Sequence, residues 1–189
     1  MSMNEQEQIH ACKKGELEHF EELYSAYVHD IYRFVYYRVR NKEVAEDVTS
    51  DIFFKALKGI THFKEGQSFR AWIYTIARNA LIDHYRKHKD IASLDNEESP
   101  DVVDDAQGIE EKQHNVLILQ QVKESLKALT EAQREIVTMR VWDELSYKEI
   151  AAITGKTEGN CKMIFSRAVG QLRDMVPVSV LIVLMVHNI

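Results

Sequence analysis

The sequence predicts an all-α protein, in which two small helical domains are joined by an acidic linker. Only seven of the 189 residues are Gly and two are Pro, whereas helix-forming Ala, Leu, Glu and Lys are plentiful. Apolar residues recur at three- and four-residue spacings in two stretches, and a run of acidic residues separates these stretches. The expected boundaries are 1–90 for the first domain, 91–115 for the linker, 116–175 for the second domain and 176–189 for an apolar tail.

Three helices are expected in the first domain. The first runs from Phe20 to about Arg40, with apolar positions at Phe20, Leu23, Tyr24, Tyr27, Ile31, Phe34, Val35 and Val39. The second spans about Lys42 to Lys58, with Gly59 as its stop, and the third runs from Phe69 to about Lys89. Amphipathic helices of this length should pack as one bundle.

The third helix has two faces of different chemistry. The core face is expected to hold Phe69, Trp72, Ile73, Ile76 and Ala80, and the exposed face Tyr74, Arg78, Asn79, Tyr85, Arg86 and Lys89. Arginine mixed with tyrosine suits phosphate pairing and the capture of unpaired bases. For Trp72, Phe69 and Phe53, packing in the core is the favoured interpretation.

The linker and the tail differ in composition from both domains. Nine acidic residues and no Lys or Arg lie between Asp90 and Glu111, which is typical of a solvated tether. The tail has an apolar run from Val176 to Val186, too short for the roughly twenty residues of a membrane-spanning helix. It either covers an apolar patch or docks a partner, and the sequence does not choose between these roles.

The second domain is predicted to contain a helix-turn-helix. Capping boxes pair Thr130 with Gln133 and Ser146 with Glu149, and Thr157 is a suitable N-cap for the last helix. The turn between the last two helices contains Gly155. The last helix should bury Cys161, Phe165, Ala168 and Leu172 and expose Lys162, Met163, Ser166, Arg167 and Gly170. Spacing alone fits DNA reading and plain packing equally, and the basic face favours DNA reading.

Charge, cysteines and motifs limit the function classes. A net charge of −6 and a pI near 5.8 imply that DNA binding is local or assisted by a partner. Two distant cysteines after a polar N-terminus predict a reducing cytoplasm and no disulfide. His84 and His88 have a zinc-compatible spacing, but no third ligand is near and their neighbours are cationic. No phosphate-binding glycine loop or nucleophile motif is present, so no enzyme activity, metal, cofactor or small-molecule substrate is predicted.

Three segments together resemble bacterial RNA polymerase sigma factors of the extracytoplasmic-function (ECF) subfamily, which consist of little more than sigma regions two and four. The resemblance covers about 20–175, and its segments are AEDVTSDIFFKAL, SFRAWIYTIARNALIDHYRK and LSYKEIAAITGKTEGNCKMIFSRAVGQLR. It implies a polymerase-binding helix, a helix that reads the promoter minus-ten element and a reader of the minus-thirty-five element. Each segment alone would be weak, whereas all three around an acidic linker are specific.

The resemblance assigns residues to these surfaces. Polymerase binding, at the clamp of the beta-prime subunit, falls to Asp47, Ser50, Asp51, Phe54 and Leu57. Minus-ten recognition falls to Phe63, Lys64, Gln67, Ser68, Asn79, Asp83, Arg86 and Lys87, and minus-thirty-five recognition to Glu158, Gly159, Asn160, Lys162, Met163, Ser166 and Arg167. The implied partners are core RNA polymerase, through the beta-prime clamp and the beta flap, promoter DNA, and an anti-sigma factor that could be membrane-bound. The linker would occupy the RNA path of the polymerase.

Two departures and two rival interpretations accompany the resemblance. Met163 and Ile164 stand where the family usually has a small or basic and a basic residue, which puts the minus-thirty-five contacts in doubt. Asn160 and Cys161 likewise replace a commoner Thr and Val. A repressor or activator that works without polymerase would bind duplex DNA tightly on its own. An adaptor that binds only proteins would tolerate mutation of Arg86 or Lys162.

Overall fold

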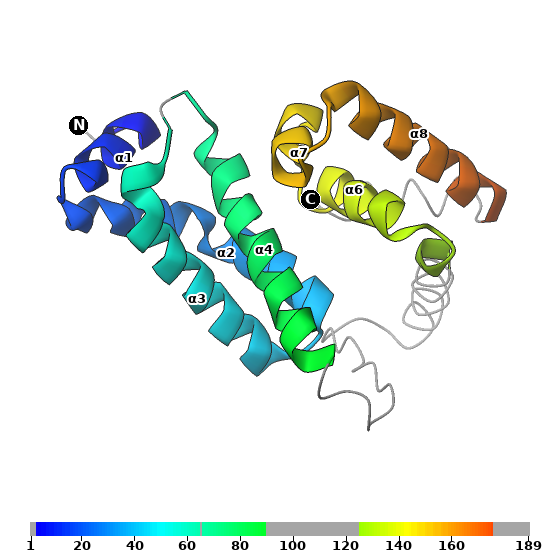
Figure 1. Ribbon diagram of the computed structural model, residues 1–189, viewed down its shortest axis with the longest axis horizontal. Coiled ribbons are helices and arrows are strands. Elements are labelled where there is room, and N and C mark those ends of the chain that lie inside the picture. Colours follow the sequence, from blue (N-terminus) through cyan, green and yellow to red (C-terminus); the bar gives the residue numbers. More distant parts are fainter. Residues whose placement is uncertain (1–2, 65, 90–124, 176–189) are drawn as a thin grey trace, which may run out of the picture. The chain divides into compact units, whose positions relative to one another are not determined.

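The two domains of the chain are both helical, as the sequence predicts. A computed structural model describes residues 3–64, 66–89 and 125–175, and the described residues contain helices and no strands (Figure 1). The chain divides into two units, Met1–Asp101 and Val102–Ile189, which are described separately below. The predicted linker and tail, and residues 116–124 of the predicted second domain, lie outside the described residues.

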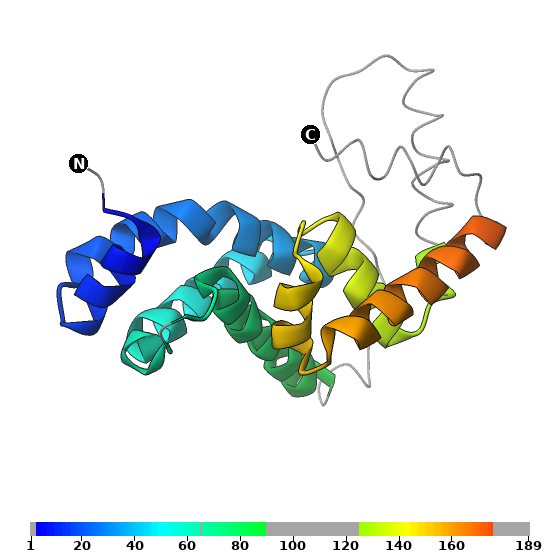
Figure 2. The ribbon, with the colours of Figure 1, turned by 90° about the horizontal axis from the view of Figure 1, so that it is seen from above.

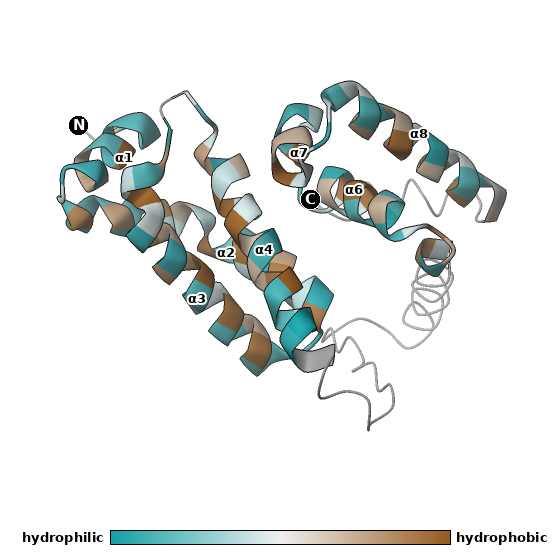
Figure 3. Cartoon of the chain, viewed as in Figure 1, coloured by the Kyte–Doolittle hydropathy of each residue, from teal (hydrophilic) through white to brown (hydrophobic). Residues whose placement is uncertain are grey.

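The first unit is built around three long helices. These are α2 (Phe20–Val39), α3 (Lys42–Gly59) and α4 (Phe69–Lys89), and each contacts the other two. Figures 1 and 2 show α3 and α4 running side by side, with α2 across them. Two 3-10 turns, η1 (Leu17–His19) and η2 (Ile60–His62), precede α2 and follow α3. Hydrophobic residues alternate with hydrophilic ones along α3 and α4 (Figure 3), as expected for helices buried on part of their surface.

A short N-terminal helix, α1 (Glu5–Lys13), was not predicted from the sequence. It begins with a reciprocal capping box between Asn4 and Glu7 and buries Ile9, Ala11 and Cys12. It packs against α2 and η2, and the Lys13 Nζ donates a hydrogen bond to the Phe63 carbonyl oxygen at 3.1 Å. The N-terminal segment is therefore part of the first unit.

The ends of α2 and α3 follow from local chemistry. Arg40 closes α2 in the left-handed region (φ 54), and its N–H donates to the Tyr36 carbonyl oxygen. Asn41 then caps α3 by accepting from the Val44 N–H. Gly59 is the last residue of α3, and its φ of −89 needs no glycine, because the chain tightens directly into η2. The predicted bounds of α2, α3 and α4 agree with the structure.

The core of the first unit is rich in aromatic side chains. Phe34 meets Tyr74 edge to face with ring centroids 5.0 Å apart, and Tyr27 meets Phe69 at 5.4 Å. The expectation that Tyr74 is exposed was wrong, because its side chain is fully buried. Helix α4 contacts both α2 and α3, so its buried arc is wider than a division into two faces allows.

The second unit is smaller, and its helices are fixed by caps. Its helices are α6 (Glu131–Val141), α7 (Tyr147–Thr154) and α8 (Glu158–Met175), and residues 125–127 are also helical. The two predicted capping boxes are both present, at the starts of α6 and α7. A core cluster forms from Leu129, Val137, Ala168 and Leu172, and Leu126, Val141, Trp142 and Phe165 pack against it. In the described part of the chain, no helix is both long and apolar enough to cross a membrane.

Candidate functional site

Helix α3 carries an exposed stripe that combines acidic and apolar side chains. Asp47, Ser50, Asp51 and Phe54 are exposed and Leu57 is half-buried, and their three- and four-residue spacing places them on one side of the helix. The other side is buried and holds Ala45, Thr49, Ile52, Phe53 and Ala56. This acidic-apolar stripe is the set of residues that sequence comparison assigned to polymerase binding.

Phe54 is the largest apolar side chain of this stripe, and 54% of its surface is exposed. The Lys58 Nζ lies 4.1 Å from the centroid of its ring, and the Lys55 Nζ lies 2.8 Å from a carboxylate oxygen of Asp51. Both contacts are solvent-exposed and add little stability. An exposed aromatic ring beside carboxylates is suited to docking a partner with a basic rim around an apolar pocket.

The loop from Phe63 to Ser68 is anchored by a buried side chain at its first residue. Phe63 is 2% exposed, and its ring centroid lies 5.9 Å from that of Phe69 and 5.3 Å from that of Trp72. The Phe63 side chain therefore holds the loop, and the assignment of this residue to minus-ten recognition stays a prediction. The interpretation of Phe69 and Phe53 as core is confirmed, whereas Trp72 is half-buried.

Lys64, Gly66, Gln67 and Ser68 of this loop are exposed, and the backbone turns at Gly66. The Gln67 N–H donates to the Lys64 carbonyl oxygen at 3.3 Å, and Gly66 has a φ of 80, which favours glycine. The Ser68 hydroxyl accepts from the Ala71 N–H at 3.2 Å at the start of α4. Lys64 and Gln67 present side chains to solvent, and Ser68 has a structural role as a cap in addition to its predicted contact with DNA.

Four further candidate residues lie along one side of α4. Asn79, Arg86 and Lys87 are exposed, and Asp83 is half-buried and pairs with Arg86 at 3.1 Å. Their spacing of four, three and one residues gathers them on one stripe that continues from the loop. The stripe carries two cations and one carboxylate, so its net charge favours a phosphate backbone even though the chain is acidic overall.

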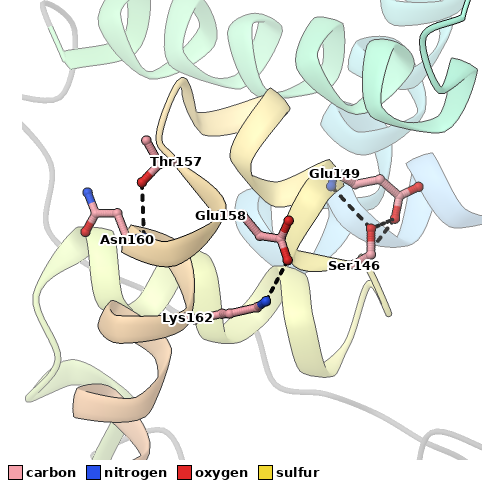
Figure 4. Close-up of polar contacts among 6 residues, drawn as sticks. All are labelled: Ser146, Glu149, Thr157, Glu158, Asn160 and Lys162. Atoms are coloured by element: carbon pink, nitrogen blue, oxygen red, sulfur yellow. Dashed lines mark hydrogen bonds and ion pairs between the residues drawn. The ribbon is translucent and has the colours of Figure 1, made fainter.

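The helix-turn-helix of the second unit is formed by α7, the turn at Gly155 and α8 (Figure 4). Gly155 adopts a left-handed conformation (φ 69), and its N–H donates to the Ala151 carbonyl oxygen. The Thr157 hydroxyl oxygen accepts from the Asn160 N–H at 3.2 Å and so caps α8. These contacts fix the angle at which α8 leaves the turn and confirm the predicted caps.

One side of α8 is buried, and the other is exposed in the described part of the chain. Cys161, Ala168 and Leu172 are buried, and Phe165 is half-buried against the Tyr147 ring at 5.8 Å. The exposed side contains all seven residues that sequence comparison assigned to the minus-thirty-five element: Glu158, Gly159, Asn160, Lys162, Met163, Ser166 and Arg167. The predicted division of this helix into a core face and an exposed face is confirmed.

Lys162, on the exposed side of α8, is held by two neighbours. Its Nζ lies 2.7 Å from a Glu158 carboxylate oxygen and 5.7 Å from the centroid of the Tyr147 ring (Figure 4 shows the ion pair). Met163 is 46% exposed, whereas Ile164 is half-buried. On this face Lys162 is paired with Glu158, and Arg167 is a second exposed cation. Met163 places a thioether where a further basic group would increase the affinity for phosphate.

Within the described segments, two titratable groups have clearly shifted pKa values. Burial raises the pKa of the Tyr85 phenol, and the nearby Arg38 and Arg40 guanidinium groups partly oppose this shift. The phenol therefore stays protonated near neutral pH and can donate its hydrogen bond. Burial likewise raises the pKa of the Cys12 thiol.

Among residues 3–64, 66–89 and 125–175, no group of three His, Cys, Asp or Glu side chains could hold a metal ion.

The fold and these surfaces define a class of protein: a helical chain of two units, with a helix-turn-helix in one unit and an exposed acidic-apolar stripe in the other. Residues 23–91 match the family model described as sigma-70 region 2, and residues 119–172 match that of sigma-70 region 4. The ECF RNA polymerase sigma factor BldN of Streptomyces coelicolor is 34% identical over 172 residues, which are 90% of this chain and 65% of BldN. The ECF sigma factor SigM of Bacillus subtilis is 30% identical over 155 residues, 82% of this chain and 93% of SigM.

The chain belongs to the ECF subfamily of RNA polymerase sigma factors, the transcription initiation factors that the three sequence segments indicated. Solved structures agree. CnrH, solved with the cytosolic domain of CnrY, superposes with a TM-score of 0.65 and covers 88% of this chain and 93% of its own, and its 20% identity supports the fold alone. RpoE of Bartonella quintana, solved with the anti-sigma factor NepR, has a TM-score of 0.64 and 26% identity, over 82% of this chain and 95% of its own.

Proposed function

We propose that this sigma factor binds core RNA polymerase through the acidic-apolar stripe of α3. The observation that carries the proposal is the pair of Asp51 and Phe54, both exposed on a helix whose other side is buried. A partner can pack against the Phe54 ring without any rearrangement of the first unit, while Asp47 and Asp51 select a basic surface. The beta-prime clamp would supply that surface, and the beta flap would meet the second unit.

Promoter recognition is assigned to the loop after η2, to α4 and to α8. Lys64, Gln67 and Ser68 would contact the melted minus-ten strand, and Asn79, Asp83, Arg86 and Lys87 would face the DNA beside it. The exposed side of α8 would read the minus-thirty-five element in the major groove. The exposure of these side chains and the buried anchors behind them support this assignment.

Asp83 has a different role from its neighbours in this assignment. A carboxylate near DNA is repelled by phosphates, yet Asp83 lies 3.1 Å from the Arg86 guanidinium. It would orient Arg86 and leave the remaining guanidinium N–H groups for the DNA. On α8 the relation is different: the Glu158 carboxylate lies 2.7 Å from the Lys162 Nζ and would compete with a DNA phosphate for that ammonium group.

The overall acidity of the chain is compatible with this function. A net charge of −6 makes tight binding of the isolated protein to DNA unfavourable, whereas within the holoenzyme the polymerase would supply most phosphate contacts. The sigma chain would then supply selection, with no covalent chemistry of its own. It would act in the cytoplasm, where polymerase and promoters are found.

We also propose an anti-sigma factor as regulatory partner. RpoE of Bartonella quintana is described in complex with the anti-sigma factor NepR, and this chain superposes on that protein over 82% of its length. An anti-sigma factor that covers the exposed Phe54 ring would prevent polymerase binding directly. The test is competition: the partner and core polymerase should exclude each other at the acidic-apolar stripe.

The decisive experiment is transcription from a random promoter library, using core polymerase from the source bacterium with and without the protein. Asp51→Arg should abolish promoter-specific transcripts and weaken core binding at least about tenfold, because it places a cation opposite a basic surface. Glu21→Arg is the control for the same kind of charge reversal, since Glu21 is an exposed carboxylate on α2 and not on α3.

The outcomes separate the proposed function from its rival. If the selected promoters share two spaced elements that Asp51→Arg loses and Glu21→Arg keeps, the protein recruits polymerase through α3. If polymerase ignores the protein while the protein alone retains specific duplexes, the helix-turn-helix belongs to a regulator that works without polymerase. If both variants lose core binding and promoter-specific transcription equally, the stripe is not the docking surface.

A further inference from the structure

The end of α2 carries a basic and aromatic segment that the proposed function does not use. From residue 31 to 42 the sequence is IYRFVYYRVRNK, with four basic residues, three tyrosines and no acidic residue. This segment occurs in a chain with a net charge of −6. Basic residues interleaved with exposed tyrosines are typical of nucleic-acid surfaces.

The end of α2 is joined to the end of α4 by a defined hydrogen bond. The Tyr85 hydroxyl of α4 donates to the Arg38 carbonyl oxygen of α2 at 2.5 Å. The guanidinium groups of Arg38 and Arg40 act electrostatically on the same phenol. Arg86 and Lys87 follow Tyr85 directly on α4. The two arginines of α2 therefore extend the basic end of the α4 surface that is assigned to the minus-ten element.

Arg38 is held in place by the core. Its guanidinium carbon lies 3.6 Å from the centroid of the Phe34 ring, and its Nη1 donates to the Phe34 carbonyl oxygen at 2.7 Å. Phe34 itself is buried. An arginine fixed in this way loses little conformational entropy when it binds an anion.

Arg40 occupies a backbone position that favours glycine. Its φ of 54 lies in the left-handed region, which costs a residue with a Cβ roughly 1–2 kcal/mol by general steric arguments. Its Nε donates to the Tyr37 carbonyl oxygen at 2.9 Å, and its guanidinium carbon lies 5.9 Å from the centroid of the exposed Tyr37 ring. Strained backbone of this kind is common where a side chain has a task beyond folding.

We propose that Tyr37, Arg38 and Arg40, together with Tyr85, form a phosphate-binding surface for double-stranded DNA next to the minus-ten element. This inference rests on the proposed function, because it extends the surface made by Arg86 and Lys87. The two arginines would contact the backbone of the duplex just beyond the melted bases, and Tyr37 would pack against the sugar. Such contacts position the DNA and carry no sequence information.

The charges that face this surface are compatible with an anion. On α4 the nearest carboxylate is Asp83, which pairs with Arg86 at 3.1 Å, and on α2 Asp30 pairs with Arg33 at 3.3 Å. Lys42 begins α3 and pairs with Glu46 at 3.9 Å. Asp83, Asp30 and Glu46 are therefore each matched by a cation other than Arg38 and Arg40.

The test uses the holoenzyme and a promoter duplex, and it measures the salt dependence of binding. Arg40→Gln should weaken promoter binding about tenfold and reduce the slope of log K against log salt by about 0.9. Arg40→Lys keeps the charge and should keep the slope. Arg40→Gly removes the charge and relieves the left-handed strain, so its melting temperature should be equal or higher while its DNA binding falls as in Arg40→Gln.

Each outcome decides the proposal. A reduced slope in Arg40→Gln and Arg40→Gly, with the same sequence preference and the same affinity for core polymerase, supports it. An unchanged slope in both variants overturns it, as does a loss of core affinity, which would place the surface against polymerase. If Arg86→Ala also leaves promoter binding unchanged, the proposed function of α4 fails, and that failure is distinct from the failure of Arg40 alone.

Discussion

The two units hold their candidate DNA-reading elements in different ways. In the first unit the loop after η2 is fixed by burial, because Phe63 packs between the rings of Phe69 and Trp72. In the second unit α8 is fixed at its N-terminal end by the left-handed turn at Gly155 and the cap at Thr157, and along its length by buried residues on the side opposite the predicted reading face. The difference predicts that stability and DNA contact are coupled tightly in the first unit, where the anchor belongs to the loop itself, and loosely in the second.

The strongest way to break this comparison is to remove the buried anchor. Phe63→Ala should lower the free energy of unfolding by about 3–5 kcal/mol, because it leaves a cavity among aromatic rings. Urea unfolding of the full chain measures this loss. Met163→Ala, on the exposed face of α8, is the control and should stay within about 0.5 kcal/mol of the parent. A stable Phe63→Ala variant that fails to open promoters would show that the ring binds a base instead.

The hydrogen bond from Lys13 of α1 to the loop allows the positioning of the loop to be tested apart from its contact with DNA. Lys13→Met keeps the aliphatic stem and deletes the hydrogen bond to the Phe63 carbonyl oxygen, worth about 1.5 kcal/mol for a charged donor. Promoter opening by holoenzyme, followed with a reporter of unpaired bases, should slow about tenfold, whereas duplex binding should change little. Lys13→Arg should restore most of the rate. An equal effect on binding and opening would mean that Lys13 acts only on stability.

Two glycines of the second unit test whether the turn before α8, and not its exposed face, determines stability. Gly155→Ala should cost about 1 kcal/mol, since alanine is disfavoured at a φ of 69. Gly170→Ala is the matched control, because its new Cβ meets no atom within 4 Å and alanine is the better helix former. It should stabilise the chain by about 0.5–1 kcal/mol. Thermal unfolding of both variants checks the signs, and a destabilising Gly170→Ala would contradict the assignment of that face to solvent.

The smallest effect should come from the ion pair on α8. Glu158→Gln removes the carboxylate that lies 2.7 Å from the Lys162 Nζ and should raise minus-thirty-five affinity about two- to threefold. Salt titration of holoenzyme binding to a promoter duplex measures the change. Stability should fall by no more than about 0.5 kcal/mol, because Glu158 also lies at the positive end of the helix dipole. A loss of affinity would show that Glu158 itself contacts a base.

Sequence patterns predicted the elements whose signals are local. The capping boxes at Thr130 and Ser146 and the exposed face of α8 follow from spacings within a few residues, and the structure has them all. The short helix α1 was missed because it has few apolar residues, although the pair of Asn4 and Glu7 is a capping signal.

The wrong expectation for Tyr74 and the unforeseen burial of Phe63, both in the first unit, have a tertiary cause. Tyr74 lies on the side of α4 that a helical wheel exposes, yet it is buried because α4 packs against two helices. Phe63 follows a turn, where no periodicity reports burial, and its aromatic partners come from α4. The basic end of α2 could have been found from composition, because no acidic residue lies between Asp30 and Glu43.

The caps that hold α8 have a consequence for how promoter preference can change. Cys161, Ala168 and Leu172 on one side, and Gly155 before the helix, carry the folding of this element, and none of them belongs to the predicted reading face. Substitutions on that face can therefore accumulate without unfolding the protein. A family built on this plan can diverge in its target genes while its scaffold stays the same, and the same face is the place to engineer sigma factors that ignore each other's promoters.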